Sequence, residues 1–225
     1  MQAAIFDLDG TLLDSMHIWA DVDAEFLAKR GIVVPDDYTE IITPMSLDET
    51  AVYTIARFGL EEGVDDLKRE WNRMVEVAYT HDVGLKPYAR EYLLSLKEHG
   101  MKLAVATSLP RSLYEPALAN NGLLHLFDAL CSTDEVGVGK RRPDVFLLAA
   151  ERLATAASSC VVYEDLLEAI ISARQAGMTT YAVYDESSKA GWQKMVEIAD
   201  GTIYNFKDAA IPGVGATAPG CSLVL

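Results

Sequence analysis

Short apolar runs alternate with segments of helical spacing through most of the chain after Pro87. The runs that predict buried strands are 102–107, 127–132, 160–163, 179–183 and 202–204. Strands that alternate with helices of this length are joined by right-handed crossovers, which arrange them as a parallel sheet with helices on both faces. The alternation therefore predicts an α/β fold built on a mainly parallel sheet.

One further apolar run, Ala3 to Phe6, predicts a first strand close to the N-terminus. Helical periodicity with almost no strand signal follows from about Ser15 to His81, where Ser46 and Glu49 have the spacing of a capping box. We therefore expect a helical insertion after the first strand. The expected parts are 1–14 with 86–208 as the core, 15–85 as the insertion and 209–225 as an irregular C-terminal tail.

The composition limits the partners of the protein. A formal net charge of −15 disfavours nucleic acid and anionic membranes, because binding to either needs clustered Lys and Arg. Cys131, Cys160 and Cys221 lie far apart and are odd in number, which favours reduced thiols over a disulfide framework. The N-terminal run lacks the basic flank and the cleavage pattern of a signal peptide. We expect a soluble, cytoplasmic protein, a monomer or a weak dimer, with a small molecule as its partner.

Polar residues stand at the ends of three expected strands, at the edge where open parallel sheets bind ligands. They are Asp7 and Asp9 after the first strand, Thr107 and Ser108 after 102–107, and Glu164 and Asp165 after 160–163. Lys140 lies in the loop before a helix that begins near Asp144. Four acidic groups, a pair of hydroxyls and one lysine are thus expected at a single edge of the sheet.

This set of groups predicts phosphoryl chemistry with a metal. Four carboxylates gathered at one place raise each other's pKa unless a cation lies among them, and oxygen ligands without histidine favour Mg²⁺. A carboxylate can act as a nucleophile and form an aspartyl-phosphate. We expect Asp7 to attack phosphorus and Asp9, which points to the same side of the chain, to move the proton. Thr107 and the backbone N–H of Ser108 can bind phosphoryl oxygens, while Lys140 neutralises the charge on them.

Simpler interpretations of the same residues stay open at this point. The segment Asp7-Leu-Asp-Gly10 alone could form a plain turn or a fragment of a calcium loop. The hydroxyl of Thr107 could bond only to backbone, and Lys140 could be a solvated loop charge. Glu164 could serve only to orient a water molecule or a neighbouring residue. A structure distinguishes these alternatives by burial and by hydrogen-bond partners.

Four motifs along the chain resemble those of the haloacid dehalogenase-like superfamily. The resemblance covers nearly the whole chain except the tail. The segment Phe6-Asp-Leu-Asp-Gly-Thr-Leu-Leu-Asp14 resembles the first motif, which is highly specific, and the strand that ends in Thr107 resembles the second. Lys140, followed by Pro143-Asp144, resembles the third motif. Tyr163-Glu-Asp165, followed by Ala176-Gly177-Met178, resembles the fourth. The order and spacing of all four together carry the resemblance.

The resemblance implies a Rossmann-like, three-layer α/β/α core with a helical cap inserted after the first motif. It implies a Mg²⁺ site formed by Asp7, the backbone carbonyl of Asp9, Asp165 and, in support, Glu164. The residues that we expect to bind the substrate are Gly10, Thr11 and Ser108. Arg141, Leu166 and Ala169 depart from the proline, serine and glycine that are usual after the third and fourth motifs. These departures remove no group that the chemistry needs.

The second aspartate narrows the expected reaction. By resemblance, the dehalogenase and phosphonate-hydrolysing branches lack an acid at the place of Asp9. The β-phosphoglucomutase branch has both aspartates and the helical cap, but its cap histidine and its phosphate-gripping arginine fall here on Trp19 and Leu47. We therefore expect a phosphatase of a small phosphomonoester, such as a sugar or polyol phosphate. The alternatives are a phosphosugar mutase and a non-enzymatic, phosphate-ligand-binding regulatory module.

Overall fold

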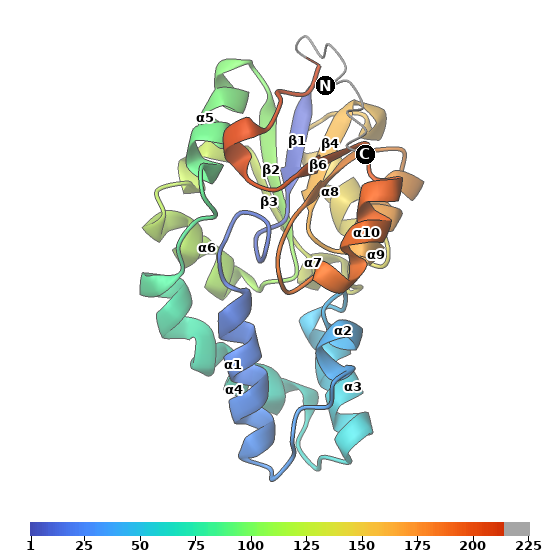
Figure 1. Ribbon diagram of the computed structural model, residues 1–225. Coiled ribbons are helices and arrows are strands. Elements are labelled where there is room, and N and C mark those ends of the chain that lie inside the picture. The colour runs from blue at the N-terminus through green and yellow to red at the C-terminus, as the bar shows by residue number, and fades with distance from the viewer. Residues whose placement is uncertain (214–225) are drawn as a thin grey trace, which may run out of the picture.

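The computed structural model describes residues 1–213, and its main feature is a six-stranded parallel sheet (Figure 1). The strand order is β3-β2-β1-β4-β5-β6, and each neighbouring pair is parallel. The strands are β1 (Ala3–Phe6), β2 (Lys102–Thr107), β3 (Ala129–Ser132), β4 (Cys160–Glu164), β5 (Thr179–Val183) and β6 (Gly201–Ile203). The predicted α/β fold with a parallel, Rossmann-like sheet is therefore confirmed.

Helices pack on both faces of this sheet and give the core three layers. The α-helices are α1 (Met16–Ala28), α2 (Tyr38–Ile42), α3 (Leu47–Phe58), α4 (Val64–Val77), α5 (Ala89–Glu98), α6 (Arg111–Asn120), α7 (Thr133–Val136), α8 (Asp144–Arg152), α9 (Leu167–Gln175) and α10 (Lys189–Ile198). The shorter helical turns are η1 (Ala78–Asp82), η2 (Leu124–Leu126), η3 (Ala157–Ser159) and η4 (Phe206–Asp208). Of these, η1 is a π-helix and the others are 3₁₀-helices.

The central strand β1 shows how the two faces are filled. Ala4 and Phe6 belong to the hydrophobic cluster that includes residues of α5 and α6, whereas Ala3 and Ile5 belong to the cluster that includes residues of α8 and α9. All four side chains are fully buried. A parallel strand covered on both faces needs apolar residues at every position, which explains the continuous apolar run at this place in the sequence.

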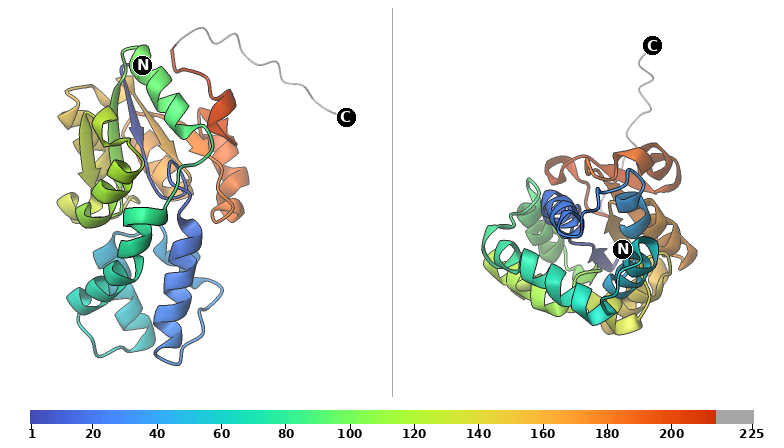
Figure 2. Two further views of the ribbon diagram at one scale, coloured as in Figure 1. Left: turned by 90° about the vertical axis from the view of Figure 1, so that its left-hand side faces the viewer. Right: turned by 90° about the horizontal axis from the view of Figure 1, so that it is seen from below.

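Helices α1 to α4 lie together beyond the carboxyl ends of the strands, apart from the helices that cover the faces of the sheet (Figures 1 and 2). The π-helix η1, which follows α4, also contacts α6, where Asn120 Nδ2 donates to the carbonyl of His81 at 3.3 Å. We refer to residues 15–85 as the cap. The predicted capping box opens α3: the N–H of Glu49 donates to Ser46 Oγ at 3.2 Å, and the N–H of Ser46 donates to Glu49 Oε2 at 2.7 Å. The rings of Phe26 on α1 and Trp71 on α4 pack with their centroids 5.2 Å apart.

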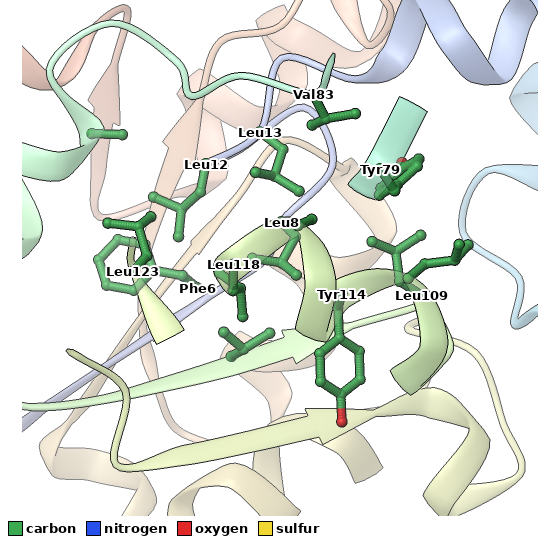
Figure 3. Packing of buried hydrophobic residues seen from close by; sticks show 14 of the residues in the cluster. Phe6, Leu8, Leu12, Leu13, Tyr79, Val83, Leu109, Tyr114, Leu118 and Leu123 are labelled. Atoms are coloured by element: carbon green, nitrogen blue, oxygen red, sulfur yellow. The ribbon is translucent and has the colours of Figure 1, made fainter. Parts of the chain in front are cut away.

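Two chain segments join the cap to the sheet, and they lie side by side. The N–H of Asp14 donates to the carbonyl of Gly84 at 3.0 Å, and the N–H of Lys86 donates to the carbonyl of Leu12 at 2.9 Å. The buried side chains around these segments include Leu8, Leu12, Leu13, Tyr79 and Val83 (Figure 3). The cap is thus attached next to the residues that follow β1.

The expected irregular tail, 209–225, lies mainly outside the described residues, which end at 213. Residues 209–213 contain a turn and neither helix nor strand. The short helices α2 and α7 are not predicted from the sequence, because they are too short to show a helical period. Within residues 1–213, none of the helices combines the length and the apolar character that crossing a membrane requires.

Candidate active site

The strand-end residues meet at the carboxyl ends of three adjacent strands. Asp7 follows β1, Thr107 ends β2 and Glu164 ends β4. Strand β1 lies between β2 and β4, and its residue Phe6 is level with Tyr163 on β4. Asp7 and Glu164, each one residue further along, are therefore neighbours. This is the edge at which open parallel sheets bind their ligands.

Lys140 is buried between two of these carboxylates. Its Nζ donates to Asp7 Oδ1 and, at 2.5 Å, to Glu164 Oε1, and only 1% of the residue is exposed. Burial lowers the pKa of the Lys140 ammonium, but the two carboxylates outweigh burial and raise that pKa above its usual range. Burial raises the pKa of Asp7, and the ammonium opposes this rise. Lys140 is therefore a fixed, charged group and not a solvated loop lysine.

Asp7, Glu164 and Asp165 form a compact acidic group. One carboxylate oxygen from each lies within 4.8 Å of the other two, and all three residues are buried. Oδ2 of Asp165 is buried and has no hydrogen-bond partner among the described residues, while Oδ1 accepts from Thr11 Oγ1 at 3.1 Å. Burial raises the pKa of Asp165 well above its usual range, and the two neighbouring carboxylates raise it further. A hard divalent cation fits this donor set, since it would offset the repulsion and pair the orphaned oxygen.

Because Gly10 has no side chain, it leaves room for the acidic group of Asp7, Glu164 and Asp165. Its φ is +76°, and a Cβ at this position would lie 2.5 Å from Asp165 Oδ2. A side chain there would be strained and would displace the carboxylate. Gly10 thus shapes the acidic group, and the buried hydroxyl of Thr11 orients Asp165. Direct contact of Gly10 or Thr11 with a substrate stays a prediction.

The side chain of Asp9 is held by residues of the cap. Asp9 Oδ1 accepts from Ser15 Oγ and from Tyr79 Oη, each at 2.5 Å, and Trp19 Nε1 donates to Tyr79 Oη at 2.6 Å. Burial raises the pKa of Asp9, and the hydrogen bonds from Ser15 and Tyr79 oppose the rise. The network fixes the orientation of this carboxyl group at the junction between cap and core. The role of Asp9 as a metal ligand through its backbone carbonyl stays a prediction.

The Tyr79→Phe variant removes one hydrogen bond from Asp9 and keeps the aromatic ring. If Asp9 transfers the proton, we expect kcat/KM for a phosphomonoester to fall about 10-fold, because a hydrogen bond to a charged group is lost. Steady-state kinetics measure this effect. The control is Tyr53→Phe, in which the lost hydroxyl is hydrogen-bonded, among residues 1–213, to Arg57 of the cap alone. Equal kinetics for Tyr79→Phe and the wild type would show that the network does not serve catalysis.

The surroundings of Thr107, Ser108 and Glu164 bear on the roles that the sequence leaves open for them. Thr107 Oγ1 accepts from the N–H of Leu109 at 3.1 Å, and its own hydrogen remains available for a further bond. Ser108 lines the cavity described below. Glu164 uses both carboxylate oxygens, since Oε2 accepts from the N–H of Leu166 at 3.0 Å. Orientation of its neighbours is therefore one role that Glu164 does fulfil.

A cavity of about 130 Å³ lies between the cap and this edge of the sheet. The charged residues that line it from the core are Asp7, Asp9, Lys140 and Asp165. The apolar residues that line it from the cap include Met16, Trp19, Ile42, Leu47 and Trp71. The cavity therefore has one charged end and one mainly apolar end.

Asp23 interrupts the apolar side of the cavity. It lies on α1, lines the cavity and is 9% exposed. Burial raises its pKa to about 7. The sequence contains a signal for this residue: Asp23 stands four positions after Trp19 and three before Phe26, in the middle of the apolar stripe of its helix. An acidic residue is unusual within an apolar stripe, yet Asp23 is not among the site residues predicted from the sequence.

The loop that carries Lys140 also touches the cap. Arg141 Nη2 donates to the carbonyl of Ile41 at 3.1 Å. A Cβ on Gly139 would lie 2.7 Å from the carbonyl oxygen of Pro44 and 2.7 Å from the backbone N of Ser46. Only a glycine permits this approach of two backbones. The residues on either side of Lys140 therefore set how closely the cap meets the core.

The Gly139→Ala variant should hold the cap away from the core. The added Cβ would also meet the side-chain Oε2 of Glu49, but the other two blocking atoms belong to backbone. The cap must therefore shift, and we expect kcat/KM to fall about 10- to 100-fold from misplacement of the cap residues. Steady-state kinetics with a phosphomonoester measure the fall. The control is Gly84→Ala, where nothing lies within 4 Å of the added Cβ. Wild-type kinetics for Gly139→Ala would contradict a closed cap in the active form.

The fold and the site define an α/β enzyme in which carboxylates and a buried lysine gather at the carboxyl edge of a parallel sheet. The family described as haloacid dehalogenase-like hydrolase matches residues 4–183 of this chain. The chain belongs to this family, and the resemblance of its four motifs is confirmed.

Several curated relatives are phosphatases by name. Validoxylamine A 7'-phosphate phosphatase of Streptomyces hygroscopicus subsp. limoneus is 30% identical over 177 residues, which cover 79% of this chain and 83% of the relative. Fructose-1-phosphate phosphatase of Escherichia coli (strain K12) is 31% identical over 183 residues, which cover 77% of this chain and 92% of the relative. The chain is similar to these two proteins among others, and each name states the activity of that relative.

Solved structures of the family have the same fold. A HAD hydrolase of Entamoeba histolytica superposes with a TM-score of 0.79 and 22% identity, over 94% of this chain and 96% of its own. The β-phosphoglucomutase of Clostridium difficile superposes with a TM-score of 0.79 and 20% identity, over 93% of each chain. At this identity the likeness shows the fold alone, so it does not separate a phosphatase from a mutase.

Proposed function

We propose that this protein is a Mg²⁺-dependent phosphatase that hydrolyses a small phosphomonoester, such as a sugar or polyol phosphate, through an aspartyl-phosphate on Asp7. The observation that carries the proposal is the buried Lys140, which contacts Asp7 and Glu164 beside the orphaned oxygen of Asp165. A carboxylate fixed by an ammonium, next to oxygens that fit a cation, is suited to attack phosphorus. The fructose-1-phosphate phosphatase among the curated relatives supports a sugar phosphate as the substrate class.

Each side chain has a role in this proposal. Asp7 attacks phosphorus in line and forms a bond to it as the bond to the alcohol oxygen breaks. Asp9 donates its proton to the departing alcohol and then accepts one from the water that hydrolyses the aspartyl-phosphate. Thr107 and the N–H of Ser108 bind phosphoryl oxygens, and Lys140 offsets their charge. The cap excludes bulk water while these bonds change.

Mg²⁺ is the cation that we propose for the acidic group. Asp7, Asp165 and the backbone carbonyl of Asp9 would hold it, with Glu164 in support. When bound, it supplies positive charge beside the phosphoryl oxygens. Removal of the metal by a chelator should therefore lower turnover at least about 100-fold, and added Mg²⁺ should restore it. Full activity in a chelator would contradict the metal assignment.

A phosphosugar mutase is the second candidate, because β-phosphoglucomutases share this fold. Trp19 and Leu47, which the resemblance aligns with the mutase histidine and arginine, both line the cavity. Lys140 is the sole Lys or Arg among the described residues that line it, and its ammonium is already paired. A bisphosphate would leave its second phosphate without a cationic partner. The phosphatase is therefore favoured.

A panel of phosphorylated metabolites tests the proposal. We expect phosphate release from at least one sugar or polyol phosphate in the presence of Mg²⁺, and no interconversion of phosphosugar isomers. Interconversion without release would identify a mutase. Complete silence towards sugar phosphates, polyol phosphates, nucleotides and phosphoglycolate would contradict the proposal and favour a phosphate-binding regulatory module.

We also propose the setting in which the protein acts. Its partner would be a small phosphorylated metabolite, with neither nucleic acid nor membrane involved, and it would act in the cytoplasm as a monomer or a weak dimer. Cys131 and Cys160 are buried free thiols, which accords with a reducing compartment. Size-exclusion chromatography with light scattering tests the oligomeric state, and a stable higher oligomer would contradict it.

A further inference from the structure

Two polar groups on the cap side of the cavity lack hydrogen-bond partners among the described residues. One is an acceptor and the other is a donor. No hydrogen bond from the described residues reaches the carboxylate of Asp23, and burial alone accounts for its raised pKa. Nε1 of Trp71 is also buried without a hydrogen-bond partner among the described residues. Both residues line the cavity, and both are at least nine-tenths buried. The cap therefore holds one unpaired acceptor and one unpaired donor.

Three other polar groups of the cap nearby are already engaged, and a fourth residue that lines the cavity, Thr39, is exposed to solvent. The hydroxyl of Thr43 donates to the carbonyl of Thr39 at 2.5 Å, and that of Thr50 donates to the carbonyl of Ser46 at 3.0 Å. Trp19 Nε1 donates to Tyr79 Oη. A buried polar group that the protein leaves unpaired costs free energy, so Asp23 and Trp71 are the groups for which a ligand would supply partners.

We propose that Asp23 and Trp71 bind a hydroxyl group at the far end of the leaving group, and that they select phosphates of polyols or sugars. A hydroxyl both donates and accepts, so it can pair with the carboxylate and with the indole N–H. An ammonium group would pair with Asp23 and leave Trp71 without an acceptor. The inference rests on the proposed phosphatase function and names the part of the cap that sets its specificity.

The position of Asp23 along α1 also indicates the length of the leaving group. A helix rises about 1.5 Å per residue, so the Cα of Asp23 lies about 12 Å along the helix from that of Ser15, whose hydroxyl contacts Asp9. Side chains on a helix lean towards its N-terminus, which shortens this span. We therefore expect a leaving group as long as a hexitol to reach from the phosphoryl site to Asp23, and one as short as glycerol to fall short of it.

The test compares hexitol 6-phosphate with hexyl phosphate, which has the same length and no hydroxyl. For the wild type we expect a higher kcat/KM with hexitol 6-phosphate. The Asp23→Leu variant should lose about 10- to 100-fold of kcat/KM with hexitol 6-phosphate and little or none with hexyl phosphate. With hexitol 6-phosphate, kcat/KM of Asp23→Asn, which keeps a neutral acceptor, should lie between the values of the wild type and Asp23→Leu. Trp71→Phe should lower kcat/KM with hexitol 6-phosphate selectively. Asp21→Leu, at an exposed position of the helix that carries Asp23, should change kcat/KM with neither substrate.

Four outcomes would overturn this inference, and they are distinct. Equal losses with both substrates for Asp23→Leu would show a structural role. A preference for an aminohexose phosphate, lost equally in Asp23→Asn and Asp23→Leu, would show that the site binds an ammonium group. A wild type that hydrolyses both esters equally well refutes the inference alone, while one that hydrolyses no phosphomonoester refutes the proposed function as well. The melting temperature of Asp23→Leu should rise, because an unpaired buried carboxyl is removed.

Discussion

The Asp7→Asn variant is expected to keep its fold and to lose at least about 10⁴-fold of its phosphate-releasing turnover, because the amide cannot form the aspartyl-phosphate. The substitution is nearly isosteric and removes one charge from a crowded acidic group. Lys140 retains its contact with Glu164 at 2.5 Å. The measurement is phosphate release from the best substrate of the panel, with circular dichroism and thermal unfolding on the same preparation.

Asp36→Asn provides the matched control for this variant. Asp36 is an exposed residue of the cap and makes no hydrogen bond to the described residues, so the same substitution there should leave turnover unchanged. Turnover of Asp7→Asn within about 10-fold of the wild type would place the nucleophile elsewhere, since loss of a true nucleophile costs several orders of magnitude.

The Lys140→Met variant should lose both activity and stability. Its side chain fills a similar volume, but Asp7 and Glu164 lose their buried partner, and removing one partner of such a pair costs about 3–5 kcal/mol of unfolding free energy. We expect turnover to fall about 10²- to 10³-fold, as when a charge-stabilising donor is removed. Chemical denaturation and steady-state kinetics measure the two effects.

Added Mg²⁺ separates the electrostatic cause from a packing defect in this variant. If uncompensated carboxylates destabilise Lys140→Met, a divalent cation should restore more stability to it than to the wild type. Lys194→Met, at an exposed position, should behave as the wild type does. A Lys140→Met protein as stable as the wild type in a chelator would contradict the buried ion pairs as a structural element.

The sequence predicts the sheet and the edge at which the site lies, because both follow from local patterns. The continuous apolar run before Asp7 indicates a strand covered on both faces, and β1 is such a strand. The polar residues that follow β1, β2 and β4 indicate a ligand-binding edge. The motif order identifies the family, which the match over residues 4–183 confirms.

The parts that the sequence could not predict depend on contacts between distant segments. Tyr79 reaches Asp9 across 70 positions of the chain, and no local pattern marks a tyrosine for that bond. The spacing of Lys140 places it in a loop, but whether it is buried depends on how that loop packs against β1 and β4. The cavity has walls from both the cap and the core, so its shape appears only when the two are together.

The central claim is that Asp7 carries the phosphoryl group during turnover, and rapid quenching of the enzyme with acid tests it directly. Wild-type protein that is mixed with excess substrate, quenched within the first turnovers and digested should yield a peptide with Asp7 and one added phosphoryl group. The label should be released by hydroxylamine, as expected for an acyl phosphate, and Asp7→Asn should carry none. Phosphate release without any label on Asp7, or with the label on another residue, would contradict the account.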